Sequence, residues 1–459
     1  MPTIQHILST AHAGLQSAQA TVAQAGQNMA NVNTPGYARE RLPISAAVAG
    51  LGVKVGDPVA VRDQLLERAL GAARSRTGFY QQEESSLRRV ESAINDLDGF
   101  GVGPSLQAFN SALSNLSANP SGLVERNGVL LSASELAVAF DTTRTQLSRG
   151  RDDSIEQAEA LSTRASGVAA QVAALNVRIS QSAGSDANAL ISQRSDLIQQ
   201  LSGMVGIETV ARSDGSVQVQ TAGGRALVDA GTSLIIEIEF GPPPERTPGM
   251  VMKRANGERL GPMGPVGGAI GGALEAVEGT IDPALAELDD VAFEFMTAFN
   301  EAHRAGFDLQ GATGTDFFTV PTDRFGAASG MGLSDAVVGE GGNIAAAVSL
   351  DEVPGGNGNL SLLADVTTRQ GTLPNGLSVL DGMARLNADV AQRIARSASN
   401  GEIETASMIQ LENLFASSSG VDIDEELIRI TQANTVLTAS TTVLQEVQSM
   451  NQTILSIIR

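Results

Sequence analysis

The chain has 459 residues, which is long enough for several domains with hydrophobic cores of their own. Its 51 acidic and 30 basic residues give a formal net charge of -21 at pH 7. This balance argues against nucleic acid or an anionic membrane as a partner, because both attract basic surfaces. The sequence contains no cysteine, which excludes disulfide bonds and thiolate sites. It also has no apolar run long enough to span a membrane, and we expect no cleaved signal peptide because the first residues lack a basic region followed by an apolar core.

The first 32 residues predict a helix that needs a partner helix. Apolar residues recur at alternating spacings of four and three, which is the a/d seam of a coiled coil. The seam consists of Ile4, Leu8, Ala11, Leu15, Ala18, Val22, Ala25, Met29 and Val32.

The last 40 residues carry a second heptad pattern. One position holds Ile423, Ile430, Leu437, Leu444 and Ile458, and a companion position holds Leu427 and Leu455. Because a heptad stripe is not buried by its own helix, we expect the two ends to pair with each other or with neighbouring copies. Small and polar residues such as Asn434 and Thr441 weaken the seams, so we expect the ends to become ordered on assembly. The alternative is an ordinary pair of surface helices that closes a bundle.

The first helix must end near Pro35-Gly36, since proline disfavours helix in the residue before it. The string from Asn28 to Tyr37 reads Asn-x-Ala-Asn-x-x-Thr-Pro-Gly-Tyr and includes Asn31 and Thr34. It resembles the N-terminal signature of the bacterial flagellar axial proteins of the rod, hook and junction. The signature stands at the end of an Ala- and Gln-rich helix near residue 1, as it does in that family.

The next 140 residues predict short strands and then long helices. Residues 51–61 alternate like a strand, and a long charged helix begins near Val61. Gly99–Ser105 breaks this helix, and further helices are expected at about 105–118, 123–150 and 161–179. Residues 188–202 form one amphipathic helix.

The hydrophobic period changes after residue 204. Val217 and Val219 alternate with polar residues, and Asn256-Gly257 is a hairpin signal. We expect residues 205–267 to form a small β unit of their own that is dispensable for polymer formation. A helix is expected at 270–303, and loops with short strands at 306–372. Helices are then expected at 377–397, at 403–417 and after the break at 418–420.

Three internal segments resemble the hook–filament junction members of the same family. They are Leu-x-x-Gln-Arg-x-x-Leu-x-x-x-Leu-Ser at 190–202, Phe-Asn-x-x-His at 299–303 with Asp-Leu-x-Gly at 308–311, and Ser-Gly-Val-Asp-Ile-Asp-Glu-Glu at 419–426. One departure is that the last helix has aliphatic or small residues, such as Ile430 and Ala433, where family members usually carry aromatics.

The sequence offers little for catalysis or cofactor binding. The three histidines are His6, His12 and His303. His6 and His12 are six residues apart, so they do not share a helix face well enough to ligate one metal, and neither belongs to a metal-ligand motif. Gly267–Gly272 is glycine-rich but lacks the spacing and the lysine of a phosphate-binding loop. Acidic residues at 422–426 are explained by the helix dipole. We therefore expect no catalytic residues, no cofactor and no metal.

The fold class expected is mainly α with β inserts, in a discontinuous layered arrangement. Residues 1–60 plus 420–459 form a terminal coiled-coil layer, residues 61–204 plus 268–305 plus 373–419 a helical domain, and residues 205–267 and 306–372 outer β-rich inserts.

The resemblance implies a secreted structural subunit that joins the flagellar hook to the filament by helical polymerisation. It implies self-association, and contacts with the hook protein, the next junction protein, an export chaperone and the flagellar secretion apparatus. Another hook or rod protein is the alternative within the family, and a secreted hydrolase or adhesin on a coiled-coil stalk is the alternative outside it. The expected assembly interface consists of Leu8, Leu15, Val22, Asn28, Met29, Asn31, Thr34, Pro35, Gly36, Tyr37, Ile423, Leu427, Ile430, Leu437, Leu444, Leu455 and Ile458.

Overall fold

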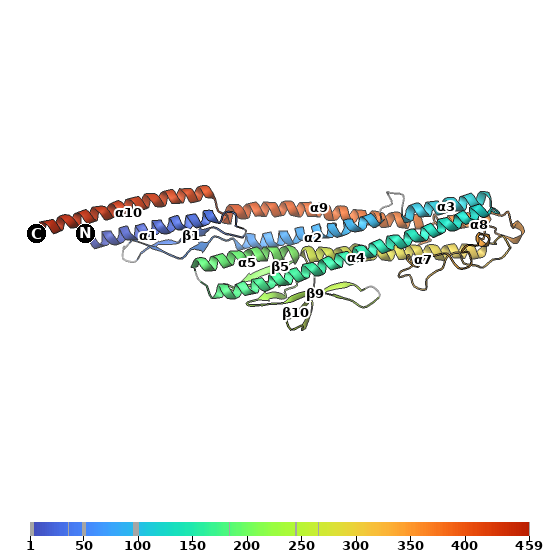
Figure 1. Ribbon diagram of the computed structural model, residues 1–459, viewed down its shortest axis with the longest axis horizontal. Helices are drawn as coiled ribbons and strands as arrows, with labels where there is room; N and C mark the ends of the chain where they lie inside the picture. The colour runs from blue at the N-terminus through green and yellow to red at the C-terminus, as the bar shows by residue number, and fades with distance from the viewer. Residues whose placement is uncertain are drawn as a thin grey trace.

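The computed structural model describes residues 4–34, 36–47, 52–94, 101–182, 184–243, 246–264 and 266–458. The molecule is a long rod, with both chain termini at one end (Figure 1). That end is formed by two helices, α1 (Ile4–Ala30) and α10 (Ile423–Ile458). The rest of the rod, called the body here, is a helical bundle that carries two β-sheets on one side (Figure 1).

The body consists mainly of long helices that run along the rod. They are α2 (Gln64–Ile94), α3 (Val102–Ala118), α4 (Leu123–Ser180), α5 (Gly184–Met204), α6 (Gly268–Ala276), α7 (Asp282–Ala305), α8 (Gly358–Asp365) and α9 (Val379–Ser419). A π-helical turn, Val277–Ile281, joins α6 to α7. The expectation of a fold that is mainly α with β inserts is confirmed.

Two helices are longer than the sequence suggested. Residues 123–150 and 161–179 belong to one uninterrupted helix, α4, and the two segments expected at 377–397 and 403–417 are both part of α9. Gly150 does not end α4. A side chain there would meet Val90 at 2.6 Å, so the glycine allows α2 to pack closely against α4. Packing along the whole length of a helix outweighs the low helix propensity of one glycine.

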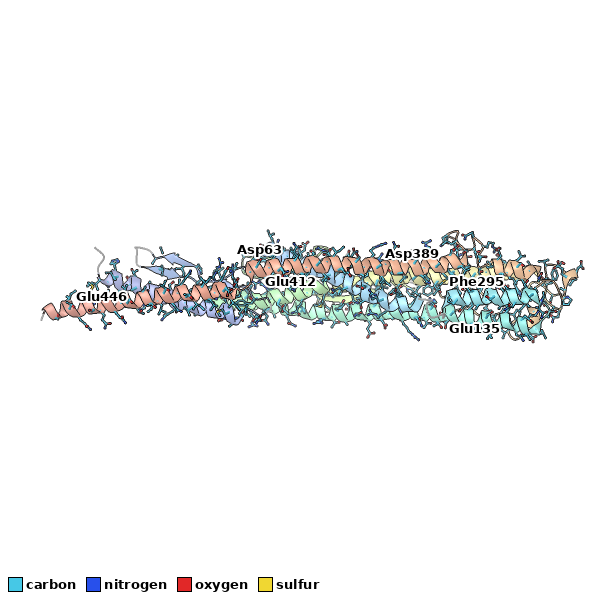
Figure 2. All side chains as sticks on the ribbon, turned by 90° about the horizontal axis from the view of Figure 1, so that it is seen from above. Asp63, Glu135, Phe295, Asp389, Glu412 and Glu446 are labelled. Atoms are coloured by element: carbon cyan, nitrogen blue, oxygen red, sulfur yellow. The ribbon has the colours of Figure 1, made fainter. Side chains whose placement is uncertain are left out.

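One hydrophobic core fills the half of the body that lies away from the termini. Six phenylalanines are fully buried there: Phe140 of α4, and a contiguous group on α3, α7 and the segment after α7 that consists of Phe109, Phe295, Phe299, Phe317 and Phe318. Neighbouring rings lie 4.8–6.2 Å apart in tilted and edge-to-face arrangements, which are favourable for aromatic pairs. In Figure 2, Phe295 lies between Glu135 of α4 at one edge and Asp389 of α9 at the other. This core holds the long helices together.

A second core lies between the helices and the β region. The strands are β5 (Ile207–Ala211), β6 (Val217–Thr221), β7 (Ala226–Asp229), β8 (Thr232–Ser233), β9 (Ile235–Phe240), β10 (Pro248–Lys253) and β11 (Arg259–Pro262). They form an antiparallel sheet in the order β5-β6-β7-β8 and another in the order β11-β10-β9. Val219 and Met252 of these sheets are buried in one cluster with Val172 of α4 and Leu201 of α5. The β region therefore shares a core with the helices and is not a separate unit, so its expected dispensability loses its basis.

A buried polar network fixes the β region to the helices. The Nδ2 of Asn176 on α4 donates to the carbonyl oxygens of Val217 at 2.8 Å and Ala230 at 3.0 Å. Its Oδ1 accepts from the backbone N–H of Val217 and from Arg194 of α5, and Arg194 also donates to the Gly215 carbonyl at 2.8 Å. Burial is the main cause that lowers the pKa of Arg194 to about 10. The Gln-Arg segment of the sequence thus serves to hold the sheet.

The segment 306–372 differs from its expectation as a β-rich insert. Among its residues, all of which the structure describes, there are two 3₁₀ turns (Gly341–Asn343 and Leu350–Glu352), helix α8 and isolated β-bridges, but no strand. Side chains of the helices make hydrogen bonds to the backbone of this segment, in place of those that a strand ladder would make. Asn300 bonds to the backbone of Phe317 and Phe318.

Two further buried side chains hold the same segment. His303 Nδ1 contacts the Thr315 carbonyl at 2.9 Å, and its Nε2 accepts from the Ala345 N–H at 3.0 Å. Burial lowers the pKa of His303, in agreement with a neutral ring that donates at Nδ1. The guanidinium of Arg126 donates to the carbonyls of Pro120 at 2.8 Å and Ile344 at 2.7 Å. Polar side chains that are widely separated in the sequence thus satisfy a loop without regular structure.

We expect Asn176→Ala to lower the free energy of unfolding by about 3 kcal/mol, because it leaves two partly buried carbonyls and part of Arg194 without partners. Chemical denaturation of the purified protein measures this change. Asn413→Ala, at an exposed position on α9, is the matched control and should change stability by less than about 0.5 kcal/mol. Equal stability of the two variants would contradict the role given to Asn176.

Candidate assembly site at the terminal helices

The two terminal helices pack against each other through their smallest residues. The buried residues of α1 include Ala11, Ala18 and Ala25, and those of α10 are Glu426, Ala433, Ser440 and Val447. Both sets repeat every seven residues. A side chain at Gly14 would lie 2.8 Å from the hydroxyl oxygen of Ser440, so the two backbones approach closely there. Small residues on facing seams thus pair the two ends of the chain within one molecule.

The larger apolar residues of the expected interface are less deeply buried. On α1, Leu8, Leu15, Val22 and Met29 are half-buried, and on α10 the same holds for Ile430, Leu437 and Leu444. Ile423 and Leu427 are 45 % and 47 % exposed. Pro35 lies outside the described residues, as do the side chains of Leu455 and Ile458. The companion row that begins at Leu427 is largely exposed, since Asn434 and Gln448 also face solvent.

A second apolar row on α10 was missed by the sequence reasoning. Val436, Val443 and Met450 are spaced by seven residues and are 47 %, 41 % and 46 % exposed. We call these three residues the outer row of α10. The signal for it was present, because a seven-residue repeat can be read from the sequence. It was overlooked because the neighbouring row at Ile430, Leu437 and Leu444 has larger side chains.

Asn28 of the signature segment is the polar centre of this end of the rod. It is fully buried at the last turn of α1. Its Nδ2 donates to the carbonyl of Glu40 at 2.9 Å and to Oε1 of Glu426 on α10 at 3.1 Å. Its Oδ1 accepts from the Tyr37 hydroxyl at 2.8 Å and from the Glu40 N–H at 3.0 Å. One amide therefore ties α1, the following loop and α10 together.

The loop after α1 leads into two small β-ribbons. Strand β1 (Glu40–Arg41) pairs with β4 (Val59–Ala60), and β2 (Ile44–Ala46) pairs with β3 (Val53–Val55). Arg39 donates from its backbone to the Ser419 carbonyl at the end of α9 and pairs with Glu425 of α10 at 2.6 Å. These contacts join the ribbons to both C-terminal helices.

Gly36 fits its position for two reasons. Its φ of +71° lies in the left-handed region that favours glycine, and a side chain there would lie 2.8 Å from the Ser192 carbonyl of α5. Arg62 reinforces this contact with bonds to the Gly36 carbonyl at 3.1 Å and to the Ser192 hydroxyl at 3.0 Å. Among the described residues, Asn31 and Thr34 bond within the end of α1 and its turn. The Thr-Pro-Gly turn thus docks the terminal layer on the body.

Acidic residues mark the first turn of α10. Asp422 accepts from the backbone N–H of Asp424 at 2.8 Å, which is an N-terminal cap. Glu426 is buried and bonds to Arg429 at 3.1 Å as well as to Asn28. Burial, followed by the carboxylates of Glu40 and Glu426, raises the pKa of the Tyr37 hydroxyl to about 12.

The remaining candidates for chemistry have structural places. His6 and His12 are both exposed on α1, and no cluster of metal-ligating side chains occurs among the residues that the structure describes. The glycines of α6 allow close packing, because a side chain at Gly272 would overlap the Phe79 carbonyl oxygen of α2 and one at Gly271 would overlap the Val266 carbonyl oxygen of the preceding loop. Within the described ranges, no helix is long and apolar enough to cross a membrane.

A rod with its two ends paired, and with an apolar row left uncovered beside that pair, defines a structural protein that assembles with other subunits. The family model of the flagellar hook-associated protein FlgK helical domain matches residues 87–318, half of the chain. The chain belongs to this family, so it is a structural subunit of the bacterial flagellum, and the family is not one of enzymes. The resemblance seen in the sequence is confirmed.

Named relatives agree with this assignment. Flagellar hook-associated protein 1 of Bacillus subtilis is 28% identical over 485 residues, which cover 93% of this chain and 92% of that protein. The protein of the same name from Escherichia coli is 27% identical over 329 residues, 68% of this chain and 60% of that one. The structure of the flagellar hook junction protein FlgK from Burkholderia pseudomallei has the same fold, with a TM-score of 0.66 at 15% identity, and covers 76% of this chain and 100% of that one.

We expect Asn28→Ala to loosen the terminal pair, at a cost of about 2–4 kcal/mol in local stability, because a buried carboxylate and a phenol lose their shared partner. Limited trypsin digestion measures this as faster cleavage after Arg39 and Arg41. Asn33→Ala, at an exposed position in the same turn, is the control. Cleavage of Asn28→Ala at the wild-type rate would refute the central role of this amide.

The terminal pair should lose stability as the pH rises from about 10 to about 12. The folded state keeps a proton on Tyr37 up to a pKa of about 12, whereas the unfolded chain releases it near the ordinary value of 10.0. The contribution is complete below pH 10 and disappears as the pH passes 12. In a Tyr80→Phe background, the ultraviolet absorbance of ionised phenol should titrate with a midpoint near 12, and a midpoint near 10 would contradict the burial of Tyr37.

Proposed function

We propose that this chain joins the flagellar hook to the filament by helical polymerisation through its terminal helices. The observation that carries this proposal is the outer row of α10. Val436, Val443 and Met450 stand beside a helix pair that is already closed, and the described residues leave each of them 41–47 % exposed. A heptad row that stays partly exposed in its own molecule can be buried further by a helix from another subunit.

The division of the chain fits this role. We take residues 1–60 plus 420–459 as the layer that polymerises, and residues 61–204 plus 268–305 plus 373–419 as the helical domain that supports it. The Asn28 amide and the contact of Gly36 with α5 fix the layer to the body. A stiff joint of this kind transmits torque from one polymer to the next, which is a mechanical function without a catalytic step.

The partners follow from the same role. The relatives are named as hook-associated and hook junction proteins, which supports contacts with the hook protein, with the next junction protein and with further copies of this chain. Delivery outside the cell requires the flagellar secretion apparatus and an export chaperone. The acidic net charge of -21 argues against nucleic acid as a partner.

We expect Val443→Asp to block assembly while it spares the monomer. An aspartate in the outer row is hydrated in the monomer but loses water when a neighbouring helix covers it, at a cost of several kcal/mol. The test is a strain without this gene that carries each variant, with hooks and filaments counted by electron microscopy. Val443→Asp cells should have hooks without filaments.

Val447→Asp is the matched control, since Val447 is only 4 % exposed and faces α1. It should lower the melting temperature of the purified monomer, whereas Val443→Asp should leave it unchanged. Normal filaments on cells that produce Val443→Asp, or on cells without the gene, would overturn the proposal.

A further inference from the structure

A groove of about 1020 Å³ runs between the first sheet of the body and helices α2 and α5. One wall of the groove is the whole of strand β5, Ile207–Ala211, and the opposite wall is formed by residues of α2 and α5. Strand β5 stands at the edge of its sheet, because its only neighbour in the order is β6. The groove therefore exposes an open strand edge.

The register tells which backbone groups face the groove. The N–H of Arg212 bonds to the Ser216 carbonyl, and the N–H of Ala222 bonds to the Gly206 carbonyl. In an antiparallel ladder such bonded pairs recur at every second residue, so Glu208 and Val210 also bond to β6. Ile207, Thr209 and Ala211 then direct their N–H and C=O groups outward. No described residue bonds to them there.

The groove also contains a buried donor and a buried acceptor. Arg62 Nε and Gln199 Oε1 both belong to residues that line it, and neither has a hydrogen-bond partner among the described residues. An extended chain offers C=O and N–H groups in alternation. Unpaired strand edges of this kind are the sites at which proteins add a strand from another chain.

A second open edge lies on the ribbon of the terminal layer. Strand β3 packs along α1, so β2 is the outer strand. The N–H of Ala47 bonds to the Gly52 carbonyl and the N–H of Gly56 to the Pro43 carbonyl. By the same alternation, Ile44 and Ala46 direct their backbone groups away from the ribbon.

Charged and apolar residues near the two edges are also complementary. Lys54 lies beside Ser45 on the ribbon, and it has no ion pair in the part of the chain that the structure covers. The carboxylate of Glu208 on β5 accepts a bond from Gln220 at 3.4 Å and from no other described residue, and Glu208 is exposed. Ile44 is 49 % exposed, while the groove offers Ile191 and Ile198 as apolar neighbours.

We propose that β2 of one subunit adds to the edge of β5 in the groove of a neighbouring copy of this chain. This inference rests on the proposed function, since it requires polymerised copies. The contact joins two different surfaces, so it repeats around a ring or along a helix and does not close as a two-fold dimer. It places the terminal layer of one subunit against the body of the next.

The geometry specifies which residues face each other. With the outward groups of Ile44 and Ala46 bonded to β5, Ser45 becomes a non-hydrogen-bonded position opposite Val210 or Glu208. Such pairs have the shortest Cα distance in an antiparallel ladder, about 4.5 Å, which is within disulfide reach. The natural chain has no cysteine, so any disulfide comes from the introduced pair.

The test replaces the chain in cells by Ser45→Cys/Val210→Cys or Ser45→Cys/Glu208→Cys. Hooks with filaments are isolated, oxidised and separated on a non-reducing gel. We expect a ladder at multiples of 47.3 kDa from one of the two pairs. The control is Lys54→Cys/Val210→Cys, because Lys54 lies one strand further away, about 5 Å more, and should give no ladder.

The outcomes separate this inference from the proposed function. Filaments without any ladder would overturn the strand pairing and leave the junction role intact. A ladder from the control variant that is as strong as that of the test pairs would have the same meaning. A cross-link to a protein of another mass would show that the groove holds a different protein and not a second copy of this chain. Normal filaments on cells that lack the gene overturn both.

A second variant tests the backbone contact itself. Thr209→Pro removes an outward N–H but none of the bonds to β6, whereas Thr209→Val keeps the N–H and the branched shape. Filaments should be at least about fivefold fewer with Thr209→Pro than with Thr209→Val. Equal numbers would count against the pairing, and the cysteine pairs decide the matter if proline lowers the melting temperature of the monomer.

Discussion

The structure depends on the close pairing of two helices that lie at opposite ends of the chain. Alanines of α1 and small residues of α10 let the two backbones approach, and Asn28 adds a buried hydrogen bond to Glu426 across the pair. Pairing through small residues has a cost, since each alanine buries little apolar surface. It also has a consequence. The larger residues remain at the margins of the pair, where a neighbouring subunit can cover them.

The joint between the terminal pair and the body follows from the same constraint. The chain must leave α1, cross to α2 and return from α9 to α10 at one level of the rod (Figure 1). Gly36 against α5, Arg62 across the turn and Arg39 at Ser419 fix these crossings by short contacts. Because these contacts connect different elements, they determine the direction in which the terminal pair leaves the body.

The body is stabilised by a repeated device, in which one buried polar side chain holds an irregular segment. Asn176 with Arg194 holds the sheets, Asn300 with His303 holds the segment after α7, and Arg126 holds the 3₁₀ turn near residue 341. Each makes several hydrogen bonds, so removal of any one leaves more than one buried group unpaired. The residues that carried the family resemblance in the sequence, such as Arg194 and His303, are among these. Their signature is therefore structural.

Sequence and tertiary structure decided different things about this protein. Heptad spacing and the Asn28–Tyr37 string predicted the terminal helices and the family, because helical period and turn chemistry are local properties. The same pattern did not tell which row each helix would bury. That choice depends on how closely the two backbones can approach. The close approach at Gly14 and Ser440 exists only in the folded chain, where these two residues face each other. Likewise, the hairpin signal at Asn256-Gly257 predicted strands, but the shared core with α4 and α5 decided that they are no separate unit. Segment 306–372 looked strand-like because the side chains that bond to its backbone, Asn300 and His303 on α7 and Arg126 on α4, are outside the segment, and only the folded chain brings them against it.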